Sequence, residues 1–264
     1  MRKSSGASTR ALTRQSGLFV RASRGSSALE RGLRLLRAFL GGAAGLTNAE
    51  LAERCGLPRS TVSRLVRSLV DEGFLEYDIA QSAYRLAPVS LSLAGAYRRS
   101  HSSLSEATAL LREVAVRERV NLSLALADGL QMVYLDSFRE GTGPVQRVVP
   151  PGSRVPIESY ASGHAVLAAM APAVRARVLS ELERSRGAGW PRQHAALQRS
   201  ARQCERHGYC VVPSTPGLVA IATALHAPDG TLCAIVLTGE RRDAAEALPR
   251  ILMSAAGLIL TLWA

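Results

Sequence analysis

The sequence predicts an α+β protein in which a small, mainly helical domain precedes a larger domain of mixed strands and helices. Two capping boxes and a helix-ending glycine occur within residues 27–56, which predicts short helices in succession. Beyond residue 105, two pairs of strand-like segments flank turns at Gly129 and at Asp229-Gly230, with helix-length segments between the pairs. A chain of 264 residues with 47% hydrophobic residues can bury the cores of two such domains.

The N-terminal segment, residues 1–26, is basic and carries no acidic residue. It holds six of the 33 basic residues and therefore half of the net charge of +12. Its Ser- and Arg-rich composition resembles that of organelle transit peptides. We expect instead a disordered basic tail that adds loose contacts to the phosphates of an anionic partner.

The cysteines and the apolar segments favour a cytoplasmic protein. The four cysteines show no CxxC spacing and no disulfide-rich pattern, which fits a reducing compartment. The longest apolar segment, residues 251–263, is too short to span a bilayer and predicts a buried C-terminal helix. No Walker, dinucleotide-binding or kinase motif occurs, so we expect neither a cofactor nor a membrane partner.

Residues 27–58 carry the start and stop signals of two helices. Ser/Thr-x-x-Glu capping boxes begin at Ser27 and at Thr47, and the second helix ends at Gly56. Pro58 suits the first position of a third helix. Leucines at helical spacing are expected to form the buried face of the first helix: Leu29, Leu33, Leu36 and Leu40.

The third helix has an apolar side and a polar side. Its apolar stripe consists of Val62, Leu65, Val66 and Leu69. A short helix, a turn with glycine and a second helix with a polar N-terminal half make a helix-turn-helix, whose second helix enters the major groove of DNA. Arg can bridge the two acceptors of guanine, and Ser or Thr can bind bases or phosphates. We therefore expect DNA contacts from Arg59, Ser60, Thr61, Ser63, Arg64 and Arg67.

A hairpin is predicted after the third helix. The segments FLEYD (74–78) and AYRLA (83–87) suit two strands, which would complete a winged helix-turn-helix domain over residues 27–87. Arg85 in this wing is expected to contact a phosphate or the minor groove. An Arg-rich amphipathic helix seen alone is often only a solvated helix. The capping boxes, the turn glycine and the wing together favour DNA binding.

Residues 88–104 predict a linker helix that also serves dimerisation. One winged helix buries too little surface for useful specificity, and paired half-sites supply the rest. We therefore expect a homodimer or a dimer of dimers on a palindromic operator in double-stranded DNA. The residues expected to face a partner helix are Leu91, Leu93, Ala94 and Tyr97.

The chain resembles the IclR family of transcriptional regulators. The likeness covers residues 25–264 and includes SALERGLRLLRAFL, LTNAELAERCGLPRSTVSRLVRSLVDEGFLEYD, RQCERHGYCV and GTLCAIVLTG. The DG-x-x-x-VYLDS and GSRVPI blocks, in this order, make it specific. The resemblance implies an N-terminal winged helix-turn-helix domain, a linker helix and a C-terminal GAF-like α/β effector-binding domain over residues 105–264. It also implies a small organic effector, often a carboxylate or an aromatic acid.

The chain departs from the family pattern where the resemblance places the effector. No acidic residue lies between Val211 and Ala222, Ala220 replaces a cysteine, and Val236 and Thr238 replace small polar residues. Fewer charges favour an aromatic or longer-chain acid. A helix N-terminus could hold its carboxylate, assisted by His164 if that side chain is partly charged. The expected effector contacts are Ser162, Gly163, His164, Ala220, Ile221, Val236 and Thr238.

Two patterns are compatible with an enzyme. Cys204, His207 and Cys210 stand three apart, but no fourth ligand is near, so we expect no metal. Ser162 and His164 combine a nucleophile and a base, yet residues so close in the chain rarely reach catalytic geometry. We expect a ligand-responsive repressor or dual regulator of a catabolic operon, with no catalytic residues. The alternatives are a constitutive DNA-binding protein with a degenerate sensor domain, and an enzyme built on residues 105–264.

Overall fold

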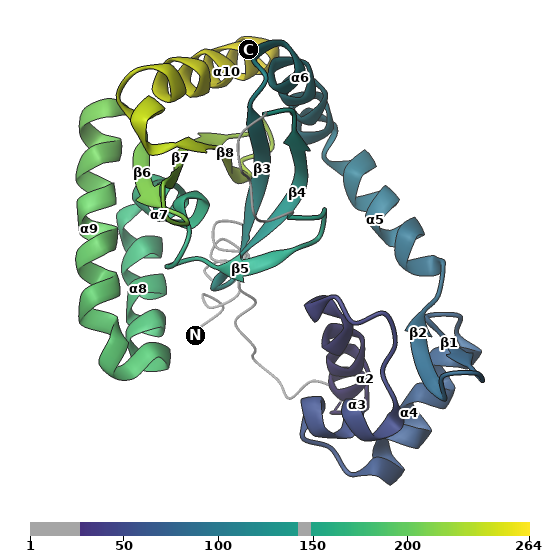
Figure 1. Ribbon diagram of the computed structural model, residues 1–264. Helices are drawn as coiled ribbons and strands as arrows, with labels where there is room; N and C mark the ends of the chain where they lie inside the picture. Colours follow the sequence, from purple (N-terminus) through teal and green to yellow (C-terminus); the bar gives the residue numbers. More distant parts are fainter. Residues whose placement is uncertain (1–26, 142–148) are drawn as a thin grey trace, which may run out of the picture. The chain divides into compact units, whose positions relative to one another are not determined.

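The structure, a computed structural model, describes residues 27–141 and 149–264 (Figure 1). The described chain divides into two compact units, with the boundary between Ser100 and His101. Both units combine helices with antiparallel sheets, which confirms the α+β class. The predicted basic tail lies outside the described residues.

The N-terminal unit is a helix-turn-helix followed by a wing. Its helices and strands are α2 (Ser27–Arg37), the 3-10 helix η1 (Ala38–Gly41), α3 (Asn48–Cys55), α4 (Arg59–Asp71), β1 (Leu75–Asp78), β2 (Ala83–Leu86) and α5 (Val89–Ser100). The core between the first three helices consists mainly of Leu35, Phe39, Leu51, Val62 and Val66. The apolar stripe predicted for the third helix is confirmed, since Leu65 and Leu69 also pack on this core.

The predicted signals at Thr47 and Gly56 are present, whereas Pro58 is the N-cap of α4 and not its first residue. The Thr47 hydroxyl accepts the N–H of Glu50, whose carboxylate accepts the N–H of Thr47 at 2.8 Å. Gly56 ends α3 in the left-handed conformation, with φ of 60°. In the wing, β1 and β2 pair antiparallel, and the rings of Tyr77 and Tyr84 lie 5.0 Å apart.

The predicted buried face of α2 is wrong for three of its four leucines, and only Leu36 packs against the core. Leu35 and Phe39 are buried, whereas Leu29 and Leu33 are 63% and 52% exposed, and Leu40 is also exposed. The segment carries two apolar stripes, and packing against α3 and α4 selects the one that contains Leu35. From Ala38 the chain continues as a 3-10 helix, so the spacing that aligned Leu40 with Leu33 no longer applies. The leucines of the other stripe therefore face solvent.

The single helix expected over residues 88–104 is two helices. Helix α5 ends at Ser100, and α6 (Ser102–Glu118) begins after His101, whose φ of −129° and ψ of 59° are not helical. Helix α6 belongs to the C-terminal unit. The sequence around His101 contains neither Gly nor Pro, so no local signal marks this break.

The C-terminal unit is built on one six-stranded antiparallel sheet of order β5-β4-β3-β8-β7-β6. The strands are β3 (Asn121–Asp128), β4 (Gln131–Arg139), β5 (Arg154–Pro156), β6 (Cys210–Pro213), β7 (Leu218–His226) and β8 (Leu232–Glu240). Both predicted hairpins are confirmed, because β3 pairs with β4 and β7 pairs with β8. Residues of one strand alternate between the two faces of the sheet, and each face carries its own apolar cluster.

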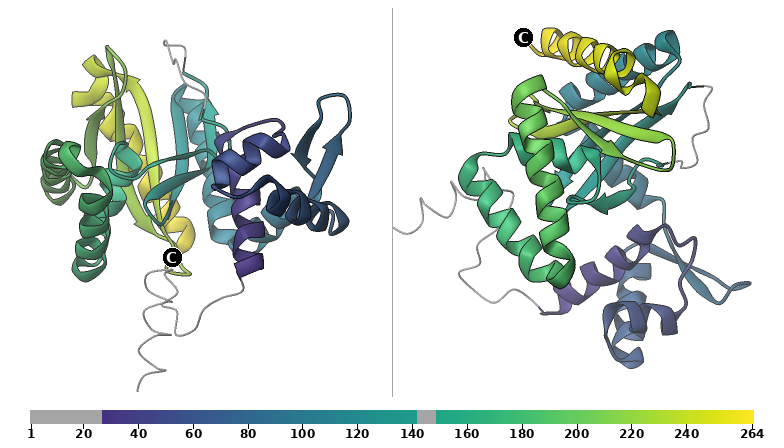
Figure 2. Two further views of the ribbon diagram at one scale, coloured as in Figure 1. Left: turned by 90° about the horizontal axis from the view of Figure 1, so that it is seen from below. Right: turned by 60° about the vertical axis from the view of Figure 1, so that its left-hand side comes forward.

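Helices cover both faces of the sheet (Figure 2). Helices α6 and α10 (Ala247–Trp263) pack on one face. The other face carries α7 (Ala161–Ala169), against which α9 (Trp190–His207) packs, and α8 (Pro172–Arg186) lies beside α9. Short 3-10 helices precede α9 and α10, at Gly187–Gly189 and Arg241–Ala245.

The C-terminal helix is buried on one side only. Leu252 and Ile259 of α10 are fully buried, as predicted for this segment. Met253, Leu258, Leu260 and Leu262 are exposed, which the prediction of a buried helix missed. A helix that lies on a sheet can bury only the stripe that faces the strands, so an all-apolar composition does not mean burial on every side.

Candidate nucleic-acid interface and ligand site

The exposed side of α4 is a basic surface. Arg59, Arg64 and Arg67 are exposed, while Val62 and Val66 on the opposite side are buried. None of these three arginines makes an ion pair with another described residue, and the first turn of α4 has no acidic residue. Their charge is therefore available to an anionic partner outside this chain.

Ser63 is less available than the sequence suggested. Its hydroxyl donates to the Arg59 carbonyl at 3.0 Å and accepts from the Asn48 amide at 3.0 Å. Ser63 therefore ties α4 to the start of α3, with one acceptor position left. Ser60 is exposed and Thr61 is half-buried. Asn48 was not predicted from the sequence, where its only signal is a polar side chain directly after the Thr47 cap.

Arg85 is engaged inside the wing. Its guanidinium forms an ion pair with Asp78 on the paired strand, and its Nε is buried with no hydrogen-bond partner among the described residues. Asp78 also accepts the N–H of Gln81 in the turn. A phosphate contact by Arg85 would compete with this ion pair, so we expect little affinity from it.

The first turn of α7 is buried and packs tightly on the segment before it. Ser162, Gly163 and His164 all lie in α7, and all are buried. A Cβ added to Gly163 would lie 1.8 Å from the Ile157 carbonyl oxygen, so only glycine fits there. The Ser162 hydroxyl is buried without a hydrogen-bond partner among the described residues. A buried hydroxyl of this kind can take a polar ligand atom.

His164 connects three segments of the C-terminal unit. Its Nε2 lies 2.9 Å from the Glu158 carbonyl oxygen, and its Nδ1 lies 2.8 Å from the Ser200 hydroxyl. A carbonyl only accepts, so Nε2 carries the proton and Nδ1 accepts from Ser200. Burial lowers the pKa of His164, against the opposing effect of the Glu158 carbonyl and carboxylate. The lowered pKa favours the neutral ring near pH 7, so the condition under which His164 was expected to assist a carboxylate is not met.

The predicted strand residues divide between the two faces of the sheet. Val236 packs with Ala161 and Ala165 of α7, and Ala220 lies against the same cluster. Thr238 pairs directly with Ala220, so it shares that face. Ile221 packs on the opposite face, in the cluster of α6 and α10. Its predicted effector contact is therefore wrong, because neighbours along a strand point to opposite sides.

Two serines that were not predicted from the sequence lie on the α7 face. Ser123 pairs with Val236, and its hydroxyl lies 2.9 Å from that of Ser137 on β4. Asn121 pairs with Thr238 on the same face. The alternation of polar and apolar residues in NLSLALAD could have revealed this polar stripe. The α7 face of the sheet thus combines small apolar and hydroxyl side chains.

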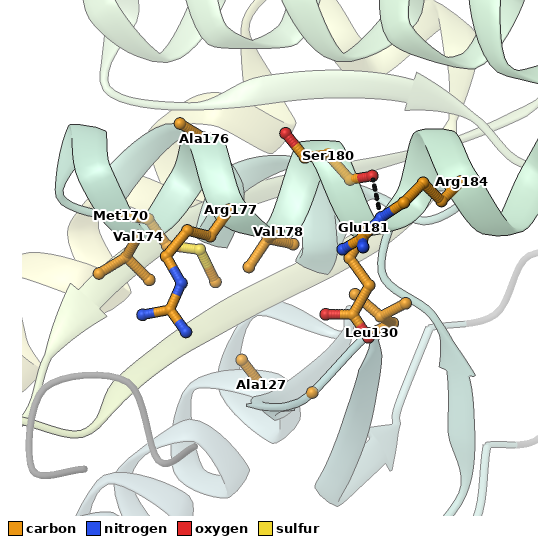
Figure 3. Close-up of a pocket in the computed structure, with 11 residues that line it drawn as sticks. Ala127, Leu130, Met170, Val174, Ala176, Arg177, Val178, Ser180, Glu181 and Arg184 are labelled. Atoms are coloured by element: carbon orange, nitrogen blue, oxygen red, sulfur yellow. Dashed lines mark hydrogen bonds between the residues drawn. The ribbon is translucent and has the colours of Figure 1, made fainter. Parts of the chain in front are cut away.

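Two grooves lie away from this face. One, of about 370 Å³, lies between α7, α8 and α9, and its lining includes His164, Leu167, Leu179, Leu197, Arg175 and Arg202. The other, of about 440 Å³, lies between α8 and the β3–β4 turn (Figure 3). Arg177 and Glu181 reach from α8 toward this turn, and Arg184 donates to the Ser180 carbonyl at 3.2 Å. This second groove includes none of the predicted effector residues.

Metal-binding and membrane-spanning features are not found in the part of the chain that the structure describes. Within residues 27–141 and 149–264, no three His, Cys, Asp or Glu side chains are grouped to hold a metal ion. Cys204, His207 and Cys210 thus do not form such a group. No helix in those ranges has the length and hydropathy needed to cross a membrane.

The chain is similar to known regulators of transcription. The model of the IclR helix-turn-helix domain matches residues 28–78. The HTH-type transcriptional regulator Rv1719 of Mycobacterium tuberculosis is 31% identical over 227 residues, which cover 80% of this chain and 81% of that protein.

Solved structures extend the similarity to nearly the whole chain. The crystal structure of an IclR family transcriptional regulator from Brucella abortus matches with a TM-score of 0.79 and 28% identity, covering 95% of this chain and 98% of that one. An IclR homolog from Microbacterium hydrocarbonoxydans, complexed with 4-hydroxybenzoate, matches with a TM-score of 0.71 and 26% identity, covering 89% and 98%.

Replacing Gly163 by Ala should destabilise the C-terminal unit. The new methyl group would overlap the Ile157 carbonyl, and such overpacking costs about 1–3 kcal/mol. The matched control is Gly257→Ala on α10, where a Cβ meets nothing within 4 Å. That change should stabilise the protein by up to about 1 kcal/mol. Urea unfolding measures both, and an unchanged unfolding midpoint for Gly163→Ala would contradict the expected overlap.

Proposed function

This chain belongs to the IclR family of transcriptional regulators, and from that premise we propose a ligand-responsive regulator that binds a palindromic operator. It is a DNA-binding regulator and not an enzyme. In the proposal, an aromatic or longer-chain organic acid changes its operator affinity, and it acts in the cytoplasm as a repressor or dual regulator of a catabolic operon. The observation that carries the proposal is the exposed, unpaired arginine side of α4 on a packed helix-turn-helix.

Base reading is assigned to the N-terminal half of α4. Arg59 and Arg64 are exposed and make no ion pair with another described residue, so each can turn its guanidinium toward a guanine. Arg67 lies one turn further along and is assigned to a phosphate. Ser60 and Thr61 add contacts at the start of the helix. Ser63 acts mainly by holding α3 and α4 together.

The effector is assigned to the α7 face of the sheet. The unpartnered Ser162 hydroxyl can hydrogen-bond a carboxylate or hydroxyl group. Val236 and Ala220 offer apolar contact, and the Thr238 hydroxyl lies on the same face. An aromatic acid suits this combination, and the Microbacterium homolog is described as a complex with 4-hydroxybenzoate. The groove that contains Arg175 and Arg202 is the rival position.

The dimer interface is assigned to the exposed leucines of the N-terminal unit. Helix α5 has no buried residue, and Leu91 and Leu93 on it are 77% and 56% exposed. Leu29 and Leu33 add an apolar stripe on α2. So much exposed apolar surface on two helices favours association. A palindromic operator requires two copies of the reading helix, which a symmetric dimer supplies.

Removing either reading arginine should weaken operator binding. For Arg59→Ala and Arg64→Ala we expect a loss of about 1–3 kcal/mol each, with relaxed preference at one base pair. Arg67→Ala should weaken all sequences alike and lower the salt slope by about 1. Arg112→Ala, an exposed arginine on α6, is the control. Footprinting titrations that give parent affinity for both reading variants would show that α4 is misassigned.

Calorimetry should find tighter binding of 4-hydroxybenzoate than of glyoxylate or pyruvate, with no effect of a chelator. Ser162→Ala and Thr238→Val should each weaken the binding of 4-hydroxybenzoate by roughly tenfold, which is the cost of losing one hydrogen bond to a charged group. Arg175→Gln with Arg202→Gln tests the rival groove and should leave binding unchanged. If the arginine pair abolishes binding while Ser162→Ala has no effect, the effector lies in the groove. Tight binding of only the two- and three-carbon acids contradicts the proposed ligand class.

Polar substitution of the exposed leucines should shift the protein toward monomer. We expect Leu91→Ser with Leu93→Ser to lower the mass measured by light scattering at micromolar concentration and to weaken binding to a palindrome. Leu260→Ser, at a leucine of α10 that is 50% exposed, serves as the control. A parent protein that is monomeric at this concentration, yet binds a palindrome at full strength, would rule out the assigned interface.

A further inference from the structure

Two of the four free thiols lie in one cluster at the end of α9. Cys204 lies in the last turn of α9, and Cys210 is the first residue of β6. Gly208, in the left-handed conformation, turns the chain between them. The Gln203 side chain accepts the N–H of Val211 at 3.0 Å and holds the start of β6 against the helix end. The Cys204 side chain packs against the buried cluster that contains Cys210.

The two thiols have different access to solvent and different reactivity. Cys204 is half-buried and Cys210 is fully buried. The neighbouring Cys210 thiol lowers the pKa of the Cys204 thiol, while the Cys204 thiol and burial raise the pKa of Cys210. The thiolate is the nucleophilic form. A half-buried thiol of lowered pKa beside a second thiol is the arrangement of a reacting and a resolving cysteine.

The pair is connected to the first turn of α7. The Cys210 thiol donates to the Ala161 carbonyl at 3.7 Å. The Ser200 hydroxyl, which lowers the pKa of Cys210, donates to Nδ1 of His164. A change at Cys210 therefore reaches Ala161 directly and His164 through Ser200.

We propose that Cys204 and Cys210 are a reversible oxidation site, which a hydroperoxide converts to a disulfide that loosens the first turn of α7. The Cys204 thiolate attacks the peroxide oxygen, which breaks the O–O bond and leaves a sulfenic acid and an alcohol, or water. The Cys210 sulfur then attacks the sulfenic sulfur, and its proton leaves with the hydroxyl group as water. The net reaction consumes two thiols and one hydroperoxide and releases one disulfide, one alcohol or water, and one water. The bond removes the hydrogen that Cys210 donates to Ala161.

The other cysteines provide an internal comparison. Cys233 is fully buried, and burial with the nearby Asp229 charge raises its pKa to about 12. Cys55 in the N-terminal unit is buried, which also raises its pKa. Neither contacts a second thiol among the described residues. We expect both to stay reduced under conditions that oxidise the pair.

Peptide mapping of the full chain tests the bond. The protein is treated with hydrogen peroxide, its remaining thiols are blocked with N-ethylmaleimide, and it is cut with trypsin without reduction. Trypsin cuts after Arg206, so the disulfide joins two peptides. Since Cys210 and Cys233 share one tryptic peptide, Cys233→Ser is mapped beside the parent. We expect loss of two of the four thiols, a Cys204–Cys210 link in both proteins, and recovery with dithiothreitol.

Variants and amide exchange test the mechanism and its effect. Cys210→Ser should stop at a sulfenic acid on Cys204 that dimedone traps, whereas Cys204→Ser should leave Cys210 as a thiol. Oxidation should speed amide hydrogen exchange in residues 161–164 of the parent and not of Cys204→Ser. Four intact thiols in the peroxide-treated parent, or a link to Cys233, would overturn the proposed site. A Cys204–Cys210 link with unchanged exchange in α7 would overturn the coupling.

Discussion

Helix α7 lies so close to the preceding segment that no side chain fits between Gly163 and the Ile157 carbonyl. This contact fixes the start of α7, and the helix in turn positions its neighbours. His164 joins the segment before α7 to Ser200 on α9. The buried Glu158 carboxylate pairs with Arg186 at the end of α8, at 2.7 Å. The start of α7 therefore contacts both α8 and α9 through the segment before it and His164. The proposed ligand site and the thiol pair both lie against this first turn of α7.

Local signals allowed much of the fold to be predicted from the sequence. The Thr47 capping box, the left-handed Gly56 and the turns at Gly129 and Gly230 each depend on chemistry within a few residues, and each is where the sequence placed it. The errors concern choices that local chemistry leaves open. Two apolar stripes on α2 are equally good in sequence, and only contact with α3 and α4 selects between them. The break at His101 has no local signal at all.

In the candidate sites, too, local signals predicted some features, and contacts between elements decided the others. The exposed arginines of α4 followed from helical periodicity alone. The partners of His164, Ser63 and Arg85 come from other elements, so the sequence could not show that these side chains are already engaged. Ile221 was a different kind of error, because the alternation of side chains along a strand is enough to separate it from Ala220.

Alternation along β7 and β8 also bears on how such a protein can diverge after gene duplication. Ala220, Val236 and Thr238 line one face of the sheet, whereas Ile221 and Leu237 belong to the core on the other face. If the effector binds the first face as proposed, substitutions there would alter which molecule is recognised without changing the core beneath α6 and α10. The cost in stability would then fall on the contact with α7, where Val236 packs against Ala161 and Ala165. A copy of this chain could therefore acquire a new chemical signal while half of the core of its C-terminal unit stays unchanged.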